Sequence, residues 1–164
     1  MPSLSPGTPV VALRSMTGSL SCRVEQLSST TPAVVYDVLM DIERWSDWMP
    51  TVSAASWEQR GEPDTGLGGI RRVRTGISVT RDRVIGGMRP HHHAYASSLP
   101  RYWPLKDYQG DVRIDERPNG CLIIWTVTCA SRIPGLGKRL QARVRSTYVR
   151  LAAALAQEAE RQAP

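Results

Sequence analysis

Residues 106–116, KDYQGDVRIDE, decide the fold class because polar and apolar side chains alternate through the whole stretch. Tyr108, Gly110, Val112 and Ile114 fall on one side of an extended chain, and the polar residues Asp107, Gln109, Asp111, Arg113 and Asp115 fall on the other. Residues 118–120, PNG, predict a turn, and residues 121–130, CLIIWTVTCA, predict a returning strand. The bulkier side chains of that strand are expected to point inward: Ile123, Trp125, Val127 and Cys129.

The segments on either side extend this hairpin into a larger antiparallel sheet. Strands are predicted over residues 20–28, 51–59, 70–75, 77–85 and 91–98, with loops over 61–69 and 99–107. Thr30 or Thr31 caps a helix that begins with Pro32, and residues 42–49 form a second short helix. A long amphipathic helix is predicted over residues 135–161. Strands in one run beside segregated helices predict an α+β fold, with an apolar cavity between helix and sheet.

Composition restricts the classes of protein that need considering. The chain has 164 residues and a formal net charge of +6, with five Trp, five Tyr and no Phe. No apolar run approaches the roughly 18 residues of a membrane span. Because the cations are spread along the chain, nucleic acid is not expected as a partner. Three widely spaced cysteines predict free, buried thiols and a cytoplasmic protein.

Residues 1–18 differ in character from the rest of the chain. They are rich in Pro, Ser and Gly, lack a basic leading region and contain no periodic apolar pattern. We therefore expect a disordered tail without a secretory signal, with Met16 as an alternative start, followed by a single domain over residues 19–161.

The order and spacing of several segments resemble the SRPBCC superfamily, the START-like and Bet v 1-like helix-grip proteins. The resemblance lies in TPAVVYDVLMDIERWSDWMPTVSAASW (31–57), GLGGIRRVR (66–74), RDRVIGGMRPHHHAYA (81–96), GCLIIWTVTC (120–129) and the terminal helix. The polyketide cyclase/dehydrase and lipid-transport branch is the most similar. This resemblance implies seven curved antiparallel strands around the last helix and a hydrophobic ligand cavity between them. It implies no particular reaction, and no catalytic residue is carried over.

Aromatic residues are the main candidates for the lining of such a cavity. Trp45 and Trp48 share one face of the second short helix, so they can close one end of the cavity or simply fill the core. Arg72, Tyr95 and Tyr108 are the polar groups expected to orient a ligand. The full set of expected ligand-binding residues is Trp45, Trp48, Trp57, Arg72, Tyr95, Trp103, Tyr108, Val112, Ile123, Trp125, Val127, Val144 and Tyr148.

Residues that suggest other chemistry have simpler interpretations. Of His91, His92 and His93, only the first and third share a strand face, so a metal site would need ligands from elsewhere, and none is expected. Asp107, Asp111 and Asp115 belong to the polar face of their strand. Asp82, flanked by two arginines, is expected in a surface ion pair.

Three functions remain open on this basis. The first is binding or transport of a small hydrophobic ligand that is lipid-, polyketide- or quinone-like. The second is a polyketide cyclase, aromatase or dehydratase, which an inward polar pair would favour. The third is a protein- or RNA-binding module that uses the basic outer surface. No cofactor is expected, and a monomer or a homodimer fits the sequence equally well.

Overall fold

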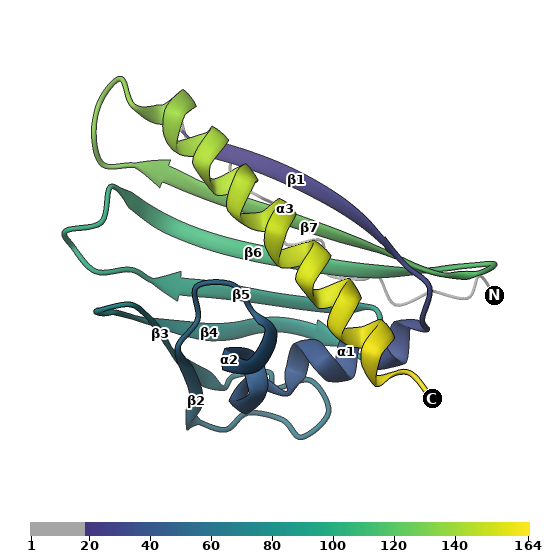
Figure 1. Cartoon of the computed structure of the whole chain (residues 1–164). Coiled ribbons are helices and arrows are strands. Elements are labelled where there is room, and N and C mark those ends of the chain that lie inside the picture. Colours follow the sequence, from purple (N-terminus) through teal and green to yellow (C-terminus); the bar gives the residue numbers. More distant parts are fainter. Residues whose placement is uncertain (1–18) are drawn as a thin grey trace, which may run out of the picture.

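The fold is a curved sheet of seven antiparallel strands with one long helix lying across it, seen in the computed structural model of Figure 1. The structure describes residues 19–164, so the tail predicted over 1–18 lies outside the described residues. The strand order is β1-β7-β6-β5-β4-β3-β2. The strands are β1 (Ser19–Ser28), β2 (Ala54–Gln59), β3 (Ile70–Thr75), β4 (Ser78–Met88), β5 (His92–Ser98), β6 (Leu105–Arg117) and β7 (Gly120–Ser131). The predicted α+β helix-grip class is confirmed.

The alternation in KDYQGDVRIDE is confirmed by the pairing of β6 with β7. Val112 lies opposite Trp125, and Ile114 lies opposite Ile123. All four side chains are at most 3% exposed. Strand β6 begins at Leu105, within the predicted loop, and its register shifts between Lys106 and Gln109. Asp107 lies in this irregularity, with a positive φ of 50°. The start of β6 therefore does not follow strict alternation, and the sequence pattern does not predict it.

Two short helices follow β1, as the sequence predicts. Helix α1 (Pro32–Met40) begins after Thr31, whose hydroxyl accepts a hydrogen bond from the Val34 amide. A single 3-10 turn, η1 (Ile42–Arg44), leads into α2 (Trp45–Trp48). In Figure 1, α1 lies near the C-terminal end of α3, which it contacts, whereas α2 contacts β2.

Helix α3 (Gly137–Gln162) lies mainly against β1 and, to a lesser extent, against β7. Its buried side is a stripe at helical spacing, in which Val144, Tyr148 and Leu155 are each at most 8% exposed. Small residues, Ala152, Ala156 and Ala159, complete the stripe. We call the face of the sheet toward α3 the inner face. It packs on large side chains near the middle of the helix.

The buried side chains form two clusters instead of one. The larger cluster lies between the inner face, α1 and α3. The smaller one consists of Ile42, Trp45, Met49 and Val73, with Trp57 packed against it. Within residues 19–164, no helix has the length and apolar character needed to cross a bilayer.

Candidate functional site

Three tyrosine hydroxyls and one indole meet on the inner face. The hydroxyl of Tyr148, on α3, lies 2.8 Å from that of Tyr108 and 3.0 Å from that of Tyr95. The indole nitrogen of Trp125 donates to the Tyr95 hydroxyl at 3.2 Å. We call these four residues the tyrosine cluster. They come from β5, β6, β7 and α3, so the cluster joins the sheet to the helix through polar contacts within an otherwise apolar core.

Burial keeps these hydroxyls neutral. It raises the pKa of Tyr95 to about 12 and also raises the pKa values of Tyr108 and Tyr148. For Tyr148, the two neighbouring tyrosines act in the same direction as burial. The cluster therefore offers neutral hydroxyl donors and acceptors, and none of its members is a ready source of a phenolate at neutral pH.

A second polar group, the arginine cluster, lies beside the first and is centred on Arg71. The guanidinium is 1% exposed; its NH2 nitrogen lies 3.3 Å from an Asp82 carboxylate oxygen, and its NH1 nitrogen lies 3.0 Å from Nε2 of His93. Ser97 donates to the other carboxylate oxygen of Asp82 at 2.6 Å. Strand register explains part of this grouping, because Arg71 lies opposite Asp82 and Asp82 lies opposite Ser97.

Aromatic rings enclose the Arg71 guanidinium. Its central carbon lies 4.8 Å from the ring centroid of Trp45 and 4.9 Å from that of Tyr95, within the range of cation–π contacts. Tyr95 therefore belongs to both polar groups, through its hydroxyl in one and its ring in the other. The ion pair with Asp82 and these rings together hold a full positive charge inside the protein.

His93 is the neutral member of the arginine cluster. Burial, and secondarily the charge of Arg71, hold the pKa of His93 well below its usual range. Since arginine can only donate, Nε2 of His93 must accept, and the hydrogen of the neutral ring is on Nδ1. Neither Nδ1 of His93 nor Nε of Arg71 has a hydrogen-bond partner among the described residues. The arginine cluster thus contains two buried N–H donors without acceptors.

Two expectations about polar residues were wrong. Arg72, expected on the inner face, is exposed on the opposite side of β3, and the inward arginine is its neighbour Arg71. Asp82 is 7% exposed in a buried ion pair, not a surface one. IRRVR has an apolar residue on each face, Ile70 with Arg72 and Val73 with Arg71, so alternation alone does not decide which arginine points inward.

The other expected lining residues divide between three places. Tyr95, Tyr108, Trp125 and Tyr148 come together in the tyrosine cluster, with Val112, Ile123, Val127 and Val144 in the surrounding core. Trp45 and Trp57 belong to the smaller cluster, and Trp48 packs against both. Trp103 lies in the loop before β6, where its indole donates to the Ser78 hydroxyl at 3.1 Å. The structure does not bring Trp57 or Trp103 to the tyrosine cluster.

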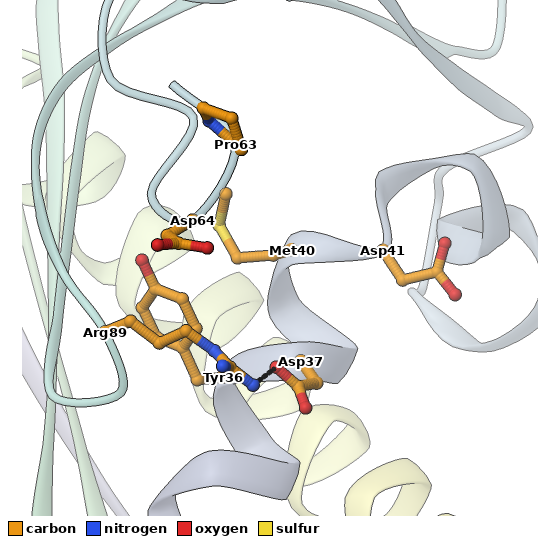
Figure 2. Close-up of a pocket in the computed structure, with 7 residues that line it drawn as sticks. All are labelled: Tyr36, Asp37, Met40, Asp41, Pro63, Asp64 and Arg89. Carbon is orange, nitrogen blue, oxygen red and sulfur yellow. Dashed lines mark hydrogen bonds and ion pairs between the residues drawn. The ribbon is translucent and has the colours of Figure 1, made fainter. Parts of the chain in front are cut away.

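Two hollows flank the core of the described residues, and neither is lined by a member of the tyrosine cluster. One hollow of about 320 Å³ lies beside α1 and is shown in Figure 2. There Arg89 donates to a carboxylate oxygen of Asp37 at 2.6 Å, close to Tyr36 and Asp64. A second hollow, of about 350 Å³, lies between β1 and the first half of α3. Around the tyrosine cluster, where the cavity was expected, side chains of the core pack on one another.

The histidines of the run at 91–93 contact different partners. His91 contacts the Ile114 carbonyl oxygen at 2.9 Å, and His92 lies 2.7 Å from the carboxylate of Asp111. Across residues 19–164, no three His, Cys, Asp or Glu side chains are grouped as metal ligands.

The fold, with a long helix across the inner face of a seven-stranded sheet, defines a helix-grip protein of the START-like and Bet v 1-like superfamily. Residues 19–160 match the family described as polyketide cyclase/dehydrase and lipid transport, and the chain belongs to that family. The sequence matches no curated protein.

Solved structures support the same fold. Zhui aromatase/cyclase from Streptomyces sp. R1128 superposes with a TM-score of 0.74 at 16% identity, over 88% of this chain and 95% of that one. A START superfamily protein from Mycobacterium smegmatis gives 0.73 at 16% identity, over 90% and 100% of the two chains. Ara h 8.0201 gives 0.71 at 14% identity, over 87% and 98%. At these identities, the likeness concerns the fold alone.

Proposed function

We propose that this protein binds a small hydrophobic ligand that carries oxygen acceptors, such as a quinone- or polyketide-like ring system, between the inner face and α3. The family supports hydrophobic ligand binding or polyketide cyclisation in general terms. The observation that carries the more specific proposal is an excess of hydrogen-bond donors inside the protein.

The tyrosine cluster has more hydrogens than contacts to accept them. Three hydroxyls and one indole supply four hydrogens, whereas three contacts join the four groups. Whichever way the hydroxyls rotate, one hydrogen has no acceptor within the cluster. The unpaired Nδ1 of His93 and Nε of Arg71 add two more donors. Buried donors without partners are costly, and a ligand oxygen would satisfy them.

Entry of a ligand requires side chains to move, because those of the core pack closely. Tyr108 is the most accessible member of the tyrosine cluster, and Leu99 and Leu140 beside the core are likewise only partly buried. All three lie toward the start of β6 and the start of α3. We infer that a ligand enters at this end, by displacing Tyr108 while Tyr148 remains as an anchor.

The experiment compares two probes that differ only in their oxygens, 1,4-naphthoquinone and naphthalene, with tryptophan fluorescence as the readout. Wild type should bind the quinone more tightly. The double variant Tyr95→Phe/Tyr148→Phe, which removes both hydroxyls on which the surplus hydrogen can reside, should reduce this preference by at least the ~0.5–1.5 kcal/mol of one hydrogen bond. Tyr102→Phe is the control, because the Tyr102 hydroxyl lies outside the cluster and is already bonded to Ser78. Equal affinity of wild type for both probes, or no binding of either, would refute the proposal.

A second candidate function, cyclisation or dehydration of a polyketide, is favoured by the Arg71–His93 pair. Ring closure of a polyketone develops negative charge on an enolate oxygen, which a buried guanidinium and a neutral imidazole N–H would stabilise. For this function, His93→Gln should lower kcat on a model poly-β-ketone by at least about tenfold, while affinity for the quinone falls by no more than the loss of one hydrogen bond explains. Equal turnover in wild type and variant leaves ligand binding as the function.

We further propose a reducing compartment, and the state of the thiols supports it. Cys22, Cys121 and Cys129 are free and buried, which favours a reducing compartment such as the cytoplasm.

A further inference from the structure

Three loops come together at one end of the sheet, at the left of Figure 1: the β3–β4 turn, the β5–β6 loop and the β7–α3 loop. Hydrogen bonds connect them. Ser78, just after the β3–β4 turn, bonds to the Tyr102 hydroxyl at 2.9 Å and accepts from the Trp103 indole at 3.1 Å. The Arg132 amide donates to the Pro104 carbonyl at 2.7 Å. We call these three loops the loop end.

Each loop of the loop end exposes one large hydrophobic side chain. Ile77 is 99% exposed, Tyr102 is 71% exposed and Ile133 is 45% exposed. A single exposed hydrophobic residue is ordinary, but these three protrude from neighbouring loops and include the two most exposed large hydrophobic residues of the described chain.

Unpaired cations surround these side chains. Six exposed basic residues lie in or beside the three loops and form no ion pair among the described residues: Arg74, Arg101, Lys106, Arg132, Lys138 and Arg139. Segments 72–80, 99–106 and 131–142 contain no Asp or Glu. The nearest acid along these segments is Asp107, which follows Lys106. The loop end thus combines positive charge with protruding apolar side chains.

We propose that the loop end docks on an anionic membrane surface. Ile77, Tyr102 and Ile133 enter the interfacial layer, and the surrounding cations lie over the lipid headgroups. Tyrosine suits this boundary because its ring is apolar and its hydroxyl is polar. An RNA strand would contact the cations but would leave the exposed isoleucines in water. An acidic protein would need a continuous patch instead of three separate protrusions, so a bilayer fits both features best.

Co-sedimentation with lipid vesicles tests this proposal. Vesicles with about one-third phosphatidylserine in phosphatidylcholine should retain the protein at low salt, and pure phosphatidylcholine should retain much less. Removing a cation, as in Arg101→Gln or Lys138→Gln, should weaken binding about fivefold for each residue changed. The Ile77→Ser/Ile133→Ser variant, whose charge is unchanged, should also bind the anionic vesicles at least about fivefold more weakly.

Matched controls lie at the opposite end of the sheet. Leu27→Ser removes a 65% exposed hydrophobic residue of β1, opposite Leu122 at the start of β7, and Arg117→Gln removes a cation at the far end of β6. Both should bind as wild type does. If the Ile77→Ser/Ile133→Ser variant binds anionic vesicles undiminished and heparin competes, the surface recognises polyanions in general and the proposal is overturned. Absence of binding to anionic vesicles overturns it as well. Because all of the changed residues are exposed, melting temperatures should stay close to wild type in every variant.

Discussion

Tyr95 and Gly110 lie directly opposite each other on β5 and β6, and the phenol ring of Tyr95 covers the glycine. A Cβ atom added at Gly110 would overlap Cζ and the hydroxyl oxygen of Tyr95. The glycine therefore sets the position of the tyrosine that the two polar clusters share.

Gly110→Ala should consequently displace Tyr95 and destabilise the protein by about 1–3 kcal/mol, as overpacking does in other cores. Urea denaturation measures the change. Gly86→Ala, where the nearest atom would be Ala94 Cβ at an ordinary 3.4 Å, is the control and should cost far less. In a Tyr95→Ala background, Gly110→Ala should have little further effect. A full additive penalty there would contradict this explanation.

Asp82→Asn should be among the most damaging single changes, because it leaves the Arg71 guanidinium buried without its counter-charge. Loss of one partner of a buried ion pair costs about 3–5 kcal/mol. Glu58→Gln breaks the exposed pair with Arg81, whose side chains are 42% and 54% exposed, and should cost less than about 1 kcal/mol. Chemical denaturation of both variants provides the comparison, and similar losses would mean that Arg71 is not truly desolvated.

His93 should make stability depend on pH near neutrality. Its folded-state pKa lies well below 6.5, so in the range between that pKa and about 6.5 the unfolded chain binds one more proton than the native protein. The stabilising contribution of neutral His93 is fully present above about pH 6.5. It declines as the pH falls below that value, by up to about 1.4 kcal/mol per pH unit. Some carboxylates, such as Asp111 and Glu160, have lowered pKa values. Their stabilising contribution is lost only when the pH falls to near their ordinary pKa values of 3.8 and 4.5.

The free energy of unfolding between about pH 7.5 and 5.5 measures this dependence. His93→Gln should flatten the slope, whereas His91→Gln, which removes an exposed histidine of the same run, should keep it. An unchanged slope in His93→Gln would assign the pH dependence to other groups.

The thiols should react slowly in the native protein. Burial raises the pKa values of Cys121 and Cys129 to about 11, so little thiolate is present near pH 8. Ellman's reagent should label native protein slowly and should label all three cysteines promptly in concentrated urea. Rapid labelling of a cysteine in the native state would mean that the strands carrying it open readily.

The sequence was most informative where polar and apolar side chains alternate, and least informative where charges occupy both faces of a strand. KDYQGDVRIDE fixes its own inward face because Val112 and Ile114 contrast with their neighbours. In IRRVR and TRDRV that contrast is weak, and the inward positions of Arg71 and Asp82 emerge only from the register of three strands. The contact between Tyr148 and Tyr95 depends in addition on how α3 is rotated against the sheet, which a helical stripe defines only approximately.

The tyrosine cluster has one further property that follows from its hydroxyls alone. Rotation about a C–O bond moves a hydrogen without moving any heavy atom, so the surplus hydrogen can reside on Tyr148 or Tyr95 while Tyr108 donates to Tyr148 and every contact is kept. An acceptor placed beside the hydroxyl of Tyr148 or of Tyr95 can therefore receive a hydrogen bond without repacking of the core. Such a site would distinguish poorly between isomers that differ in the position of one oxygen, and shape would have to provide whatever selectivity the protein has.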